Sequence, residues 1–206
     1  MSLDNFSNLK SSILEWSKRG DQEANVEDYI SIAESEMYAN TFEPIRTRAM
    51  EARATASASG RFLALPNLFL QMRRLNIVTS NGNCDVTYMA PEQLAVRGTT
   101  GQPRFFTVTT QLEFDVTPDS AYTIEMQYLK KLTPLSDAAP TNSILTDSPM
   151  VYLYGALWAL FLNVHEHDVA KSYYEMFINS IKGINKADKR GRYGPAPKIR
   201  MEGATP

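Results

Sequence analysis

The sequence predicts an α+β fold, with a helical bundle built from N- and C-terminal helices and a β-rich antiparallel insertion between them. Near both ends of the chain, apolar residues recur at three- and four-residue steps, which is the spacing of an amphipathic helix. The middle of the chain instead alternates apolar and polar residues and contains an Asn-Gly turn, and both are signals of antiparallel strands. These observations divide the 206 residues into helical, strand-rich and helical parts.

The expected organisation has four segments. The last is expected to be a flexible basic arm, because its glycine and proline residues oppose regular structure. The predicted boundaries are residues 1–48 for the N-terminal helices of the bundle, 49–135 for the β-rich insertion, 136–187 for the C-terminal helices of the bundle and 188–206 for the arm.

Two helices are expected in the first segment. The apolar stripe of the first is formed by Phe6, Leu9, Ile13 and Trp16. Gly20 is expected as its C-cap. Asn25 is placed to cap the second helix, and Glu27 and Asp28 lie in its first turn, where the helix dipole favours negative charge. The expected buried face of the second helix consists of Val26, Tyr29, Ile30, Ala33, Met37 and Tyr38.

Two hairpins are expected in the insertion. Asn81 and Gly82 lie between two β-prone runs and favour a tight turn, with residues 84–89 as the return strand. A second hairpin is predicted because two later stretches alternate apolar with polar residues, and residues 117–120 between them have turn composition. Its apolar positions are Leu112, Phe114 and Val116 in one strand and Ile124, Met126 and Tyr128 in the other. Such a hairpin has one buried and one solvated face.

The first C-terminal helix is predicted to be apolar on nearly all sides. Pro149 suits the first turn after a cap at Asp147 or Ser148, and residues 151–162 are apolar almost without interruption. A helix of this kind must be covered on every side, and in a domain this small another subunit can supply part of the cover. Asp168 is expected to cap a final long helix. The apolar positions of that helix are Val169, Tyr173, Phe177, Ile178, Ile181 and Ile184.

Aromatic side chains in these two helices are candidates for a subunit interface, since Tyr and Trp are enriched at interfaces. The candidates are Tyr152, Tyr154, Trp158 and Tyr173. The alternative is that the same residues only fill the core of the monomer, and the sequence leaves both interpretations open.

The net charge of −2 conceals an acidic body and a basic C-terminal segment. Residues 182–200 hold seven basic residues and one acid, a net charge of +6, and the other 14 basic and 22 acidic residues give −8. Such a segment can be a solvated tail, a phosphate contact or an arm that docks in an acidic groove of a partner. Its aromatic and aliphatic residues favour docking, because a purely electrostatic arm needs no apolar anchors. The candidate docking residues are Lys186, Lys189, Arg190, Arg192, Tyr193, Lys198, Ile199 and Arg200.

No catalytic residue, metal site or cofactor is expected. His165 and His167 are the only histidines, and a polar turn between helices explains them better than a metal site does. Cys84, the single cysteine, has no histidine partner visible in the sequence and is expected to be structural or incidental. The sequence contains no glycine-rich phosphate-binding motif, and strand alternation explains the carboxylates of the insertion.

No membrane segment or export signal is expected. Residues 151–162 fall short of the roughly 20 residues that a helix needs to cross a bilayer. Residues 1–5 lack the basic and apolar regions of a signal peptide, so synthesis in the cytoplasm is the default expectation.

The order of these features resembles that of the head-to-tail adaptor, or connector, proteins of short-tailed bacteriophages. The resemblance covers about residues 25–187 and lies in order and pattern, not in a catalytic signature. The stretches that carry it are the N-terminal helices ending near residues 38–53, the segment Leu63-Ala-Leu-Pro-Asn-Leu-Phe-Leu70, the strand ending in Tyr128-Leu-Lys-Lys-Leu132 with Pro134 and Leu135 after it, and the apolar helix 151–162 followed by the helix from Asp168.

The resemblance implies a non-enzymatic virion protein that forms a ring, typically of twelve copies, beneath the portal protein at the head-tail interface. Such a ring extends the DNA channel used in genome ejection, binds no DNA specifically, and docks a tail nozzle or tail tube protein. Several members reach the portal with an extended C-terminal segment, which assigns portal docking to the basic arm as a hypothesis. The acidic remainder of the chain suits a DNA channel, because a negative lumen repels phosphate. The alternative is a nucleic-acid-binding module that acts through the basic tail.

Overall fold

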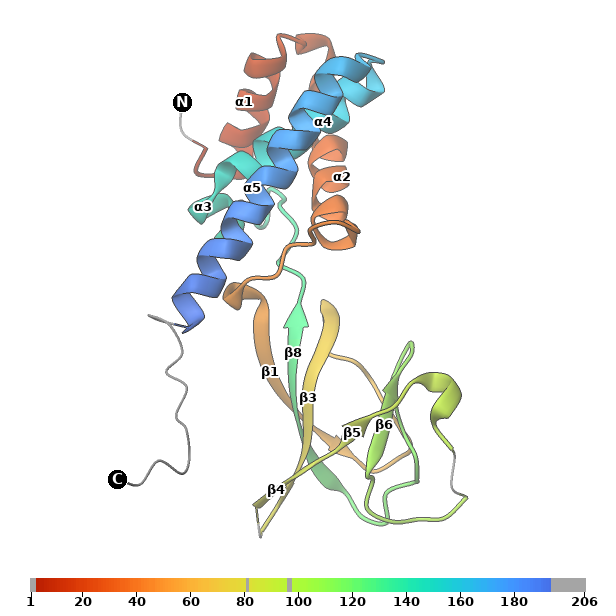
Figure 1. Ribbon diagram of the computed structural model, residues 1–206. Coiled ribbons are helices and arrows are strands. Elements are labelled where there is room, and N and C mark those ends of the chain that lie inside the picture. Colours follow the sequence, from red (N-terminus) through yellow and green to blue (C-terminus); the bar gives the residue numbers. More distant parts are fainter. Residues whose placement is uncertain (1–2, 81, 96–97, 194–206) are drawn as a thin grey trace, which may run out of the picture. The chain divides into compact units, whose positions relative to one another are not determined.

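The computed structural model describes residues 3–80, 82–95 and 98–193 and contains both helices and sheets (Figure 1), which confirms the predicted α+β class. The chain forms two compact units. Unit 1 joins the two ends of the chain, Met1–Ala49 and Thr133–Pro206, and unit 2 is the continuous segment Met50–Leu132. The α-helices belong to unit 1 and the strands to unit 2.

Helices from both ends of the chain build unit 1. They are α1 (Phe6–Ser17), α2 (Val26–Ala39), α3 (Ser143–Asp147), α4 (Pro149–Asn163) and α5 (His167–Tyr193), with the 3-10 turns η1 (Gly20–Asn25) and η2 (Arg48–Met50) nearby in the chain. Helix α4 contacts α1, α2, α3 and α5, so it lies at the centre of the unit.

Helix α4 is covered largely by its own unit. Its side chains without exposed surface are Val151, Tyr152, Leu153, Ala156, Leu157 and Leu160. Gly155 allows the close approach of two neighbours, because a Cβ there would lie 2.8 Å from Ala33 Cβ of α2 and 2.9 Å from a ring carbon of Phe177 of α5. The predicted apolar surface of this helix therefore serves mainly as the core of the monomer.

The turn between α1 and α2 differs from the prediction. Lys18 ends α1 in the left-handed conformation with a φ of 55°, whereas the expected C-cap, Gly20, begins turn η1. Asn25 precedes α2, yet its side-chain amide donates a hydrogen bond to Gln22 Oε1 inside η1 and does not cap the helix. The 3-10 turn η1 therefore leads directly into α2, and among the described residues no side chain caps the start of that helix.

Helix α5 begins at His167, one residue before its expected cap, Asp168. The first helical hydrogen bond runs from the backbone N–H of Ala170 to the carbonyl of Glu166, at 2.9 Å. His165 has a φ of 63° in the tight turn that joins α4 to α5. The helix therefore begins two residues earlier than an N-cap at Asp168 implies, and Glu166 takes the place of the expected cap.

Two sheets build unit 2. The strands are β1 (Glu51–Ala58), β2 (Phe62–Leu63), β3 (Phe69–Thr79), β4 (Gly82–Asp85), β5 (Thr87–Tyr88), β6 (Phe105–Val108), β7 (Leu112–Phe114) and β8 (Tyr122–Lys130), with the 3-10 turn η3 (Pro91–Gln93). The strand order is β1-β8-β3-β4 in one sheet, called sheet A here, and β2-β7-β6-β5 in the other, called sheet B. Both sheets contribute to one hydrophobic core, which includes Leu75, Ile77, Ile124 and Met126 from sheet A and Phe106, Leu112 and Phe114 from sheet B.

A β3–β4 hairpin is present where the sequence predicts one, but Gly82 is the first residue of β4 and not part of the turn, and Asn81 lies outside the described residues. Strands β3 and β4 pair antiparallel, with Thr79 opposite Gly82, whose φ is 118°. The return strand is shorter than the prediction, since β4 ends at Asp85 and β5 already belongs to sheet B. The chain crosses from one sheet to the other at this point.

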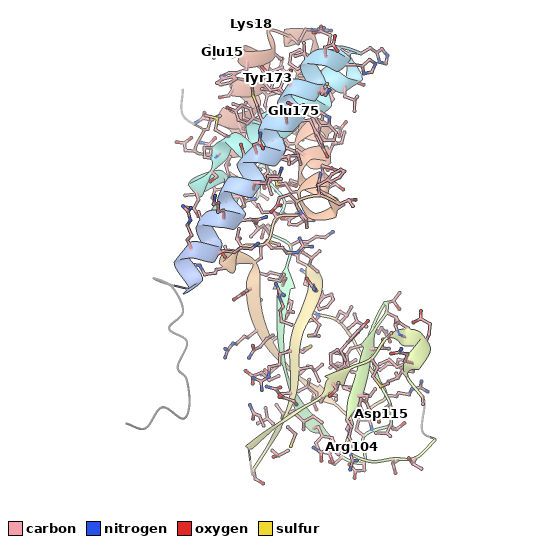
Figure 2. The ribbon with its side chains drawn as sticks, viewed as in Figure 1. Glu15, Lys18, Arg104, Asp115, Tyr173 and Glu175 are labelled. Carbon is pink, nitrogen blue, oxygen red and sulfur yellow. The ribbon has the colours of Figure 1, made fainter. Side chains whose placement is uncertain are left out.

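The second predicted hairpin is wrong, because β7 and β8 lie in different sheets. Between them, buried Asp115 accepts hydrogen bonds from the backbone N–H groups of Arg104 and Phe105, at 3.1 and 3.2 Å (Figure 2). These bonds fix Asp115, the residue directly after β7, to the start of β6. The predicted alternation is still present in both strands, since each turns its apolar side to the shared core.

The insertion is also not wholly antiparallel. Strands β5 and β6 pair in parallel, with Thr87 opposite Phe105. A parallel pair needs a crossover connection, and the long loop that contains η3 provides it. Turn signals in the sequence indicate where a strand ends but not which strand it joins next.

Candidate interaction surfaces

The C-terminal part of α5 is anchored to the segment that follows α2. Asn185 is buried; its Oδ1 accepts from the backbone N–H of Arg46 and its Nδ2 donates to the carbonyl of Pro44, both at 3.0 Å. One turn later, Asp188 Oδ1 accepts from the backbone N–H and from Nε of Arg48, at 3.0 and 3.1 Å. These bonds stabilise the helix beyond the point at which the sequence predicts a flexible arm.

Basic side chains are exposed on this anchored part of α5. They belong to Lys182, Lys186, Lys189 and Arg190. Helix α5 continues to Tyr193, so residues 188–193 of the expected arm are helical. Of the other predicted docking residues, the side chains of Arg192 and Tyr193 and the whole of Lys198, Ile199 and Arg200 lie outside the described part of the structure.

Two of the predicted interface residues, Tyr154 and Tyr173, belong to an aromatic cluster on α4 and α5, and a third, Trp158, packs on other rings of α5. Tyr173 stacks on Phe161, with ring centroids 5.4 Å apart, and its ring centroid lies 6.3 Å from that of Tyr154. The ring of Trp158 is stacked 6.4 Å from Phe177. Tyr154, Trp158 and Tyr173 are half-buried, so each makes contacts within unit 1 and also leaves part of its side chain exposed to solvent. Tyr173 is labelled in Figure 2.

A groove of about 520 Å³ opens beside this cluster. Its lining residues are Trp16, Tyr154, Asp168, Val169, Ser172, Tyr173 and Met176. The side chains of Trp16 and Met176 are 44% and 47% exposed. Trp16 was expected in the apolar stripe of the first helix, and Met176 was not named. Helical spacing assigns a residue to an apolar face but does not say how far neighbouring helices cover that face, so the exposure of these two side chains could not be predicted.

Tyr152, the fourth candidate, has no exposed surface. Its hydroxyl donates to Glu34 Oε1 at 3.1 Å and accepts from Asn142 Nδ2 at 2.6 Å. Glu34 Oε1 also accepts from the backbone N–H of Leu135, at 2.9 Å. Burial raises the pKa of the Glu34 carboxyl and that of the Tyr152 hydroxyl. Tyr152 therefore holds the segment before α4 in place within unit 1.

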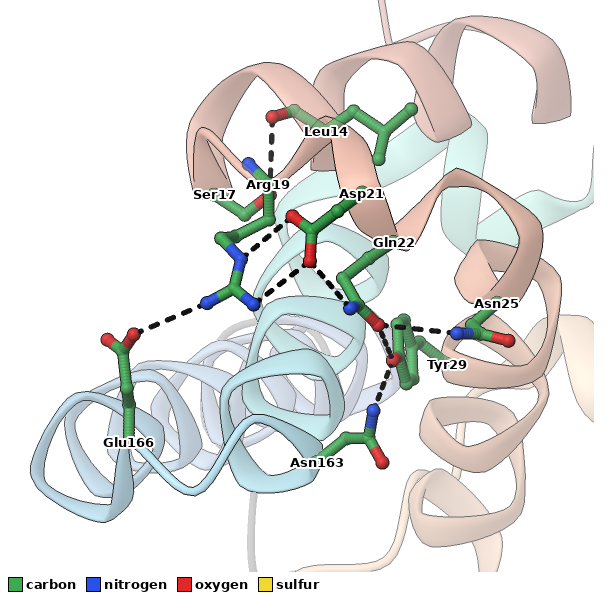
Figure 3. A network of polar contacts seen from close by, with 9 residues as sticks. All are labelled: Leu14, Ser17, Arg19, Asp21, Gln22, Asn25, Tyr29, Asn163 and Glu166. Carbon is green, nitrogen blue, oxygen red and sulfur yellow. Dashed lines mark hydrogen bonds and ion pairs between the residues drawn. The ribbon is translucent and has the colours of Figure 1, made fainter.

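A polar network joins η1 to three helices (Figure 3). Arg19 binds Asp21 through Nε at 2.9 Å, and its guanidinium lies 3.6 Å from Glu166 Oε1 at the start of α5. The hydrogen bond from Arg19 lowers the pKa of the Asp21 carboxyl. Asn163 Nδ2 at the end of α4 donates to the hydroxyl of Tyr29 on α2, at 2.7 Å. The network thus connects the α1–α2 turn to α2, to the end of α4 and to the residue that precedes α5.

The model of the SU10 adaptor protein family matches residues 4–199, which is nearly the whole chain. The chain belongs to the SU10 adaptor protein family. This membership confirms the resemblance to head-to-tail phage adaptors and indicates a structural role as a component of the virion. A comparison with curated proteins found no match.

The candidate catalytic groups of this adaptor are scattered. Both histidines are exposed, with ring centroids 6.1 Å apart, and Cys84 is exposed on β4. Within residues 3–80, 82–95 and 98–193, no three His, Cys, Asp or Glu side chains are grouped so that they could hold a metal ion. The SU10 adaptor family is a structural family and not a known family of enzymes.

A helix that crosses a lipid bilayer must be about 20 residues long and predominantly apolar. None of the helices in the described residues is both long and apolar enough to span a membrane. Helix α4 is the most apolar, and its 15 residues are buried mainly by the other helices of unit 1.

Proposed function

We propose that this adaptor forms a closed ring of about twelve copies that binds the portal protein, extends the DNA channel and docks the tail nozzle or tail tube. The observation that carries the proposal is the family match across residues 4–199. The protein is made in the host cytoplasm and becomes part of the head-tail interface of the virion. Unit 1 acts in this ring as a helical bundle, and the ring needs no cofactor.

The aromatic groove is the proposed site of contact between unit 1 of neighbouring subunits. Rings use heterologous interfaces, in which two different surfaces of the same chain meet. Such interfaces are enriched in aromatic residues and Met. Trp16, Tyr154 and Tyr173 supply rigid apolar surface around a groove of about 520 Å³, and Trp158 adds a half-buried ring on α4 that is stacked on Phe177.

The basic end of α5 and the arm after it form the proposed portal-docking element. Lys186, Lys189 and Arg190 are exposed on a helix that Asn185 and Asp188 hold in place. A preorganised cationic helix loses little conformational entropy when it binds an acidic surface. The remaining chain carries a net charge of −8, which suits a channel that DNA passes through without binding.

The mass of the protein with and without portal tests the ring. We expect the mass of the complex with portal to equal that of a portal ring plus about one adaptor per portal subunit, measured by native mass spectrometry or light scattering. Apolar surface that a monomer leaves exposed is the physical reason for this association. A chain that stays monomeric when portal is present contradicts the proposal.

Truncation after Tyr193 and the charge reversal Lys189→Glu/Arg190→Glu test the docking element. Both variants keep Asn185 and Asp188, so α5 is expected to stay folded. We expect the affinity for portal to fall at least roughly tenfold, which corresponds to about 1.4 kcal/mol. Lys171→Glu, a charge reversal at an exposed site near the other end of α5, is the matched control. Normal portal binding together with loss of DNA affinity would instead favour the nucleic-acid-binding alternative.

A further inference from the structure

Strand β1 presents an open edge of sheet A. Among the described strands it pairs with β8 alone, over all eight of its residues and without a bulge. In an antiparallel pair, every second residue turns its backbone N–H and C=O away from its partner. Proteins usually protect such an edge with Pro, Lys, a bulge or a very short strand. Residues 51–58 contain neither Pro nor Lys, and the charged residues of the strand, Glu51 and Arg53, lie near its start, so residues 54–58 carry none of these devices.

The side chains of β1 leave room for another strand. Ala52, Ala54 and Ala56 lie on the core side of the sheet and are only partly buried. Thr55 and Ser57 lie on the opposite side and are short as well. A neighbouring strand lies about 4.8 Å away in a sheet, and none of these side chains is long enough to fold over the edge and block it.

The other edge of the same sheet is formed by β4, whose four residues are all exposed. All pairs in sheet A are antiparallel, so β1 and β4 run in opposite directions. A β4 strand placed beside β1 therefore continues the antiparallel order of the sheet. Each copy of the chain thus carries two complementary edges, which is what a heterologous contact requires.

Charge on the outer side of the sheet favours the same pairing. Arg53 of β1 and Asp85 of β4 lie on the side opposite the core, and their side chains are 73% and 62% exposed. Each has a partner within its own subunit, Glu125 and Arg74. When two edges meet, opposite charges in adjacent strands stabilise the pairing by roughly 0.2–1 kcal/mol.

We propose that β1 of one subunit pairs with β4 of a second copy of this chain, so that sheet A continues from subunit to subunit in the ring. The inference rests on the proposed ring and identifies a contact in unit 2 besides the aromatic groove. The backbone supplies hydrogen bonds in this contact, and the core side of β1 receives the side chains of the incoming strand.

Cysteine cross-linking tests the pairing in the complex with portal. Cys84 is the single cysteine, and it shares the core side of the sheet with Ala52, Ala54 and Ala56, as Cys84 lies opposite Ile77. Directly opposed residues on one face have Cβ atoms about 4.5–5.5 Å apart, close to the range of a disulfide. Ala52→Cys, Ala54→Cys and Ala56→Cys together sample the register. The matched controls are Thr55→Cys and Ser57→Cys, which lie on the other side of the sheet.

We expect mild oxidation of at least one of the three core-side variants to give a ladder of covalent multimers on a non-reducing gel, up to the number of subunits in the ring. The unchanged chain has one cysteine and cannot exceed a dimer. A ring of normal mass without a ladder, or with equal ladders from Thr55→Cys and Ser57→Cys, overturns the β1–β4 pairing and leaves the proposed function standing. A protein that forms no ring with portal overturns the proposed function and this inference together.

Discussion

Glu34 shows how a single carboxylate can hold a loop. It accepts hydrogen bonds from Leu135 and from the hydroxyl of Tyr152, and burial nevertheless raises its pKa above 4.5. A group whose pKa is raised on folding favours the folded state most at low pH, and this contribution is lost as the pH rises through the folded pKa. The charge on Glu34 is thus a cost at neutral pH that the hydrogen bonds partly offset.

Glu34→Gln removes this pH dependence. Glutamine keeps an oxygen acceptor for Leu135 and Tyr152 but cannot ionise. We therefore expect the free energy of unfolding of Glu34→Gln to decrease less than that of the unchanged protein between pH 4.5 and about pH 7. Denaturant titrations at several pH values measure the difference. Glu175→Gln, at an exposed position on α5, is the control, and equal pH profiles for Glu34→Gln and the unchanged protein would contradict the assignment.

Residues with a polar role inside unit 1 were the least predictable from the sequence. Tyr152 was left open between core and interface, and its hydrogen bonds to Glu34 and Asn142 show a role in the core. These partners lie 118 and 10 positions away in the chain. Neither spacing nor composition indicates such a contact, because it depends on how two separate segments of unit 1 fold together.

At the scale of elements, the close crossing of α4 with α2 and α5 depends on Gly155. Helices approach this closely only where a side chain is missing, and two neighbours lie within 3.0 Å of the position of a Cβ. Both neighbours are buried, so they have little room to move.

Gly155→Ala is expected to destabilise the protein by about 1–3 kcal/mol, because the added methyl group overpacks the core. Gly183→Ala is the matched control on α5, where nothing lies within 4 Å of the new Cβ. That change is expected to stabilise the helix by about 0.5–1 kcal/mol. Thermal unfolding of the two variants measures both effects, and a melting temperature for Gly155→Ala at or above that of the unchanged protein would contradict the packing argument.

The presence of four of the helices was more predictable than the pairing of the strands, although the short α3 and the full length of α5 were not predicted. The periodicity near both chain ends identified α1, α2, α4 and α5, whose hydrogen bonds are local. Alternation also identified β7 and β8 as half-buried strands, yet placed them in one hairpin. Two stretches that face the same core show the same alternation whether they pair with each other or lie in opposite sheets.

At the scale of the whole chain, unit 2 has the properties of an inserted domain. It is one continuous segment, Met50–Leu132, with a core of its own between two sheets. The strands at its two ends are paired, with Glu51 opposite Leu129, so the chain leaves and re-enters unit 1 at neighbouring points. The change in periodicity along the sequence predicted a β-rich insertion between helical segments. The proposed portal and ring contacts depend on partner proteins, so the residues of this chain alone do not predict them.

Residues 50–132 expressed alone are therefore expected to fold. Domains of this size can bury enough apolar surface for independent stability. We expect a cooperative denaturant transition followed by circular dichroism. Phe114→Ala, which removes a fully buried ring from the core, is expected to cost about 3–5 kcal/mol and to abolish or strongly weaken the transition. A non-cooperative profile for the unchanged segment would show that the core of unit 2 depends on unit 1.

The central position of α4 has a consequence for synthesis. Helices α1 and α2 emerge from the ribosome first, but the helix they pack against follows only after all of unit 2 has been translated. Domains generally fold as units during translation. The inserted sheets can therefore form while the two leading helices still expose their apolar faces, and these helices acquire their partner only when α4 emerges.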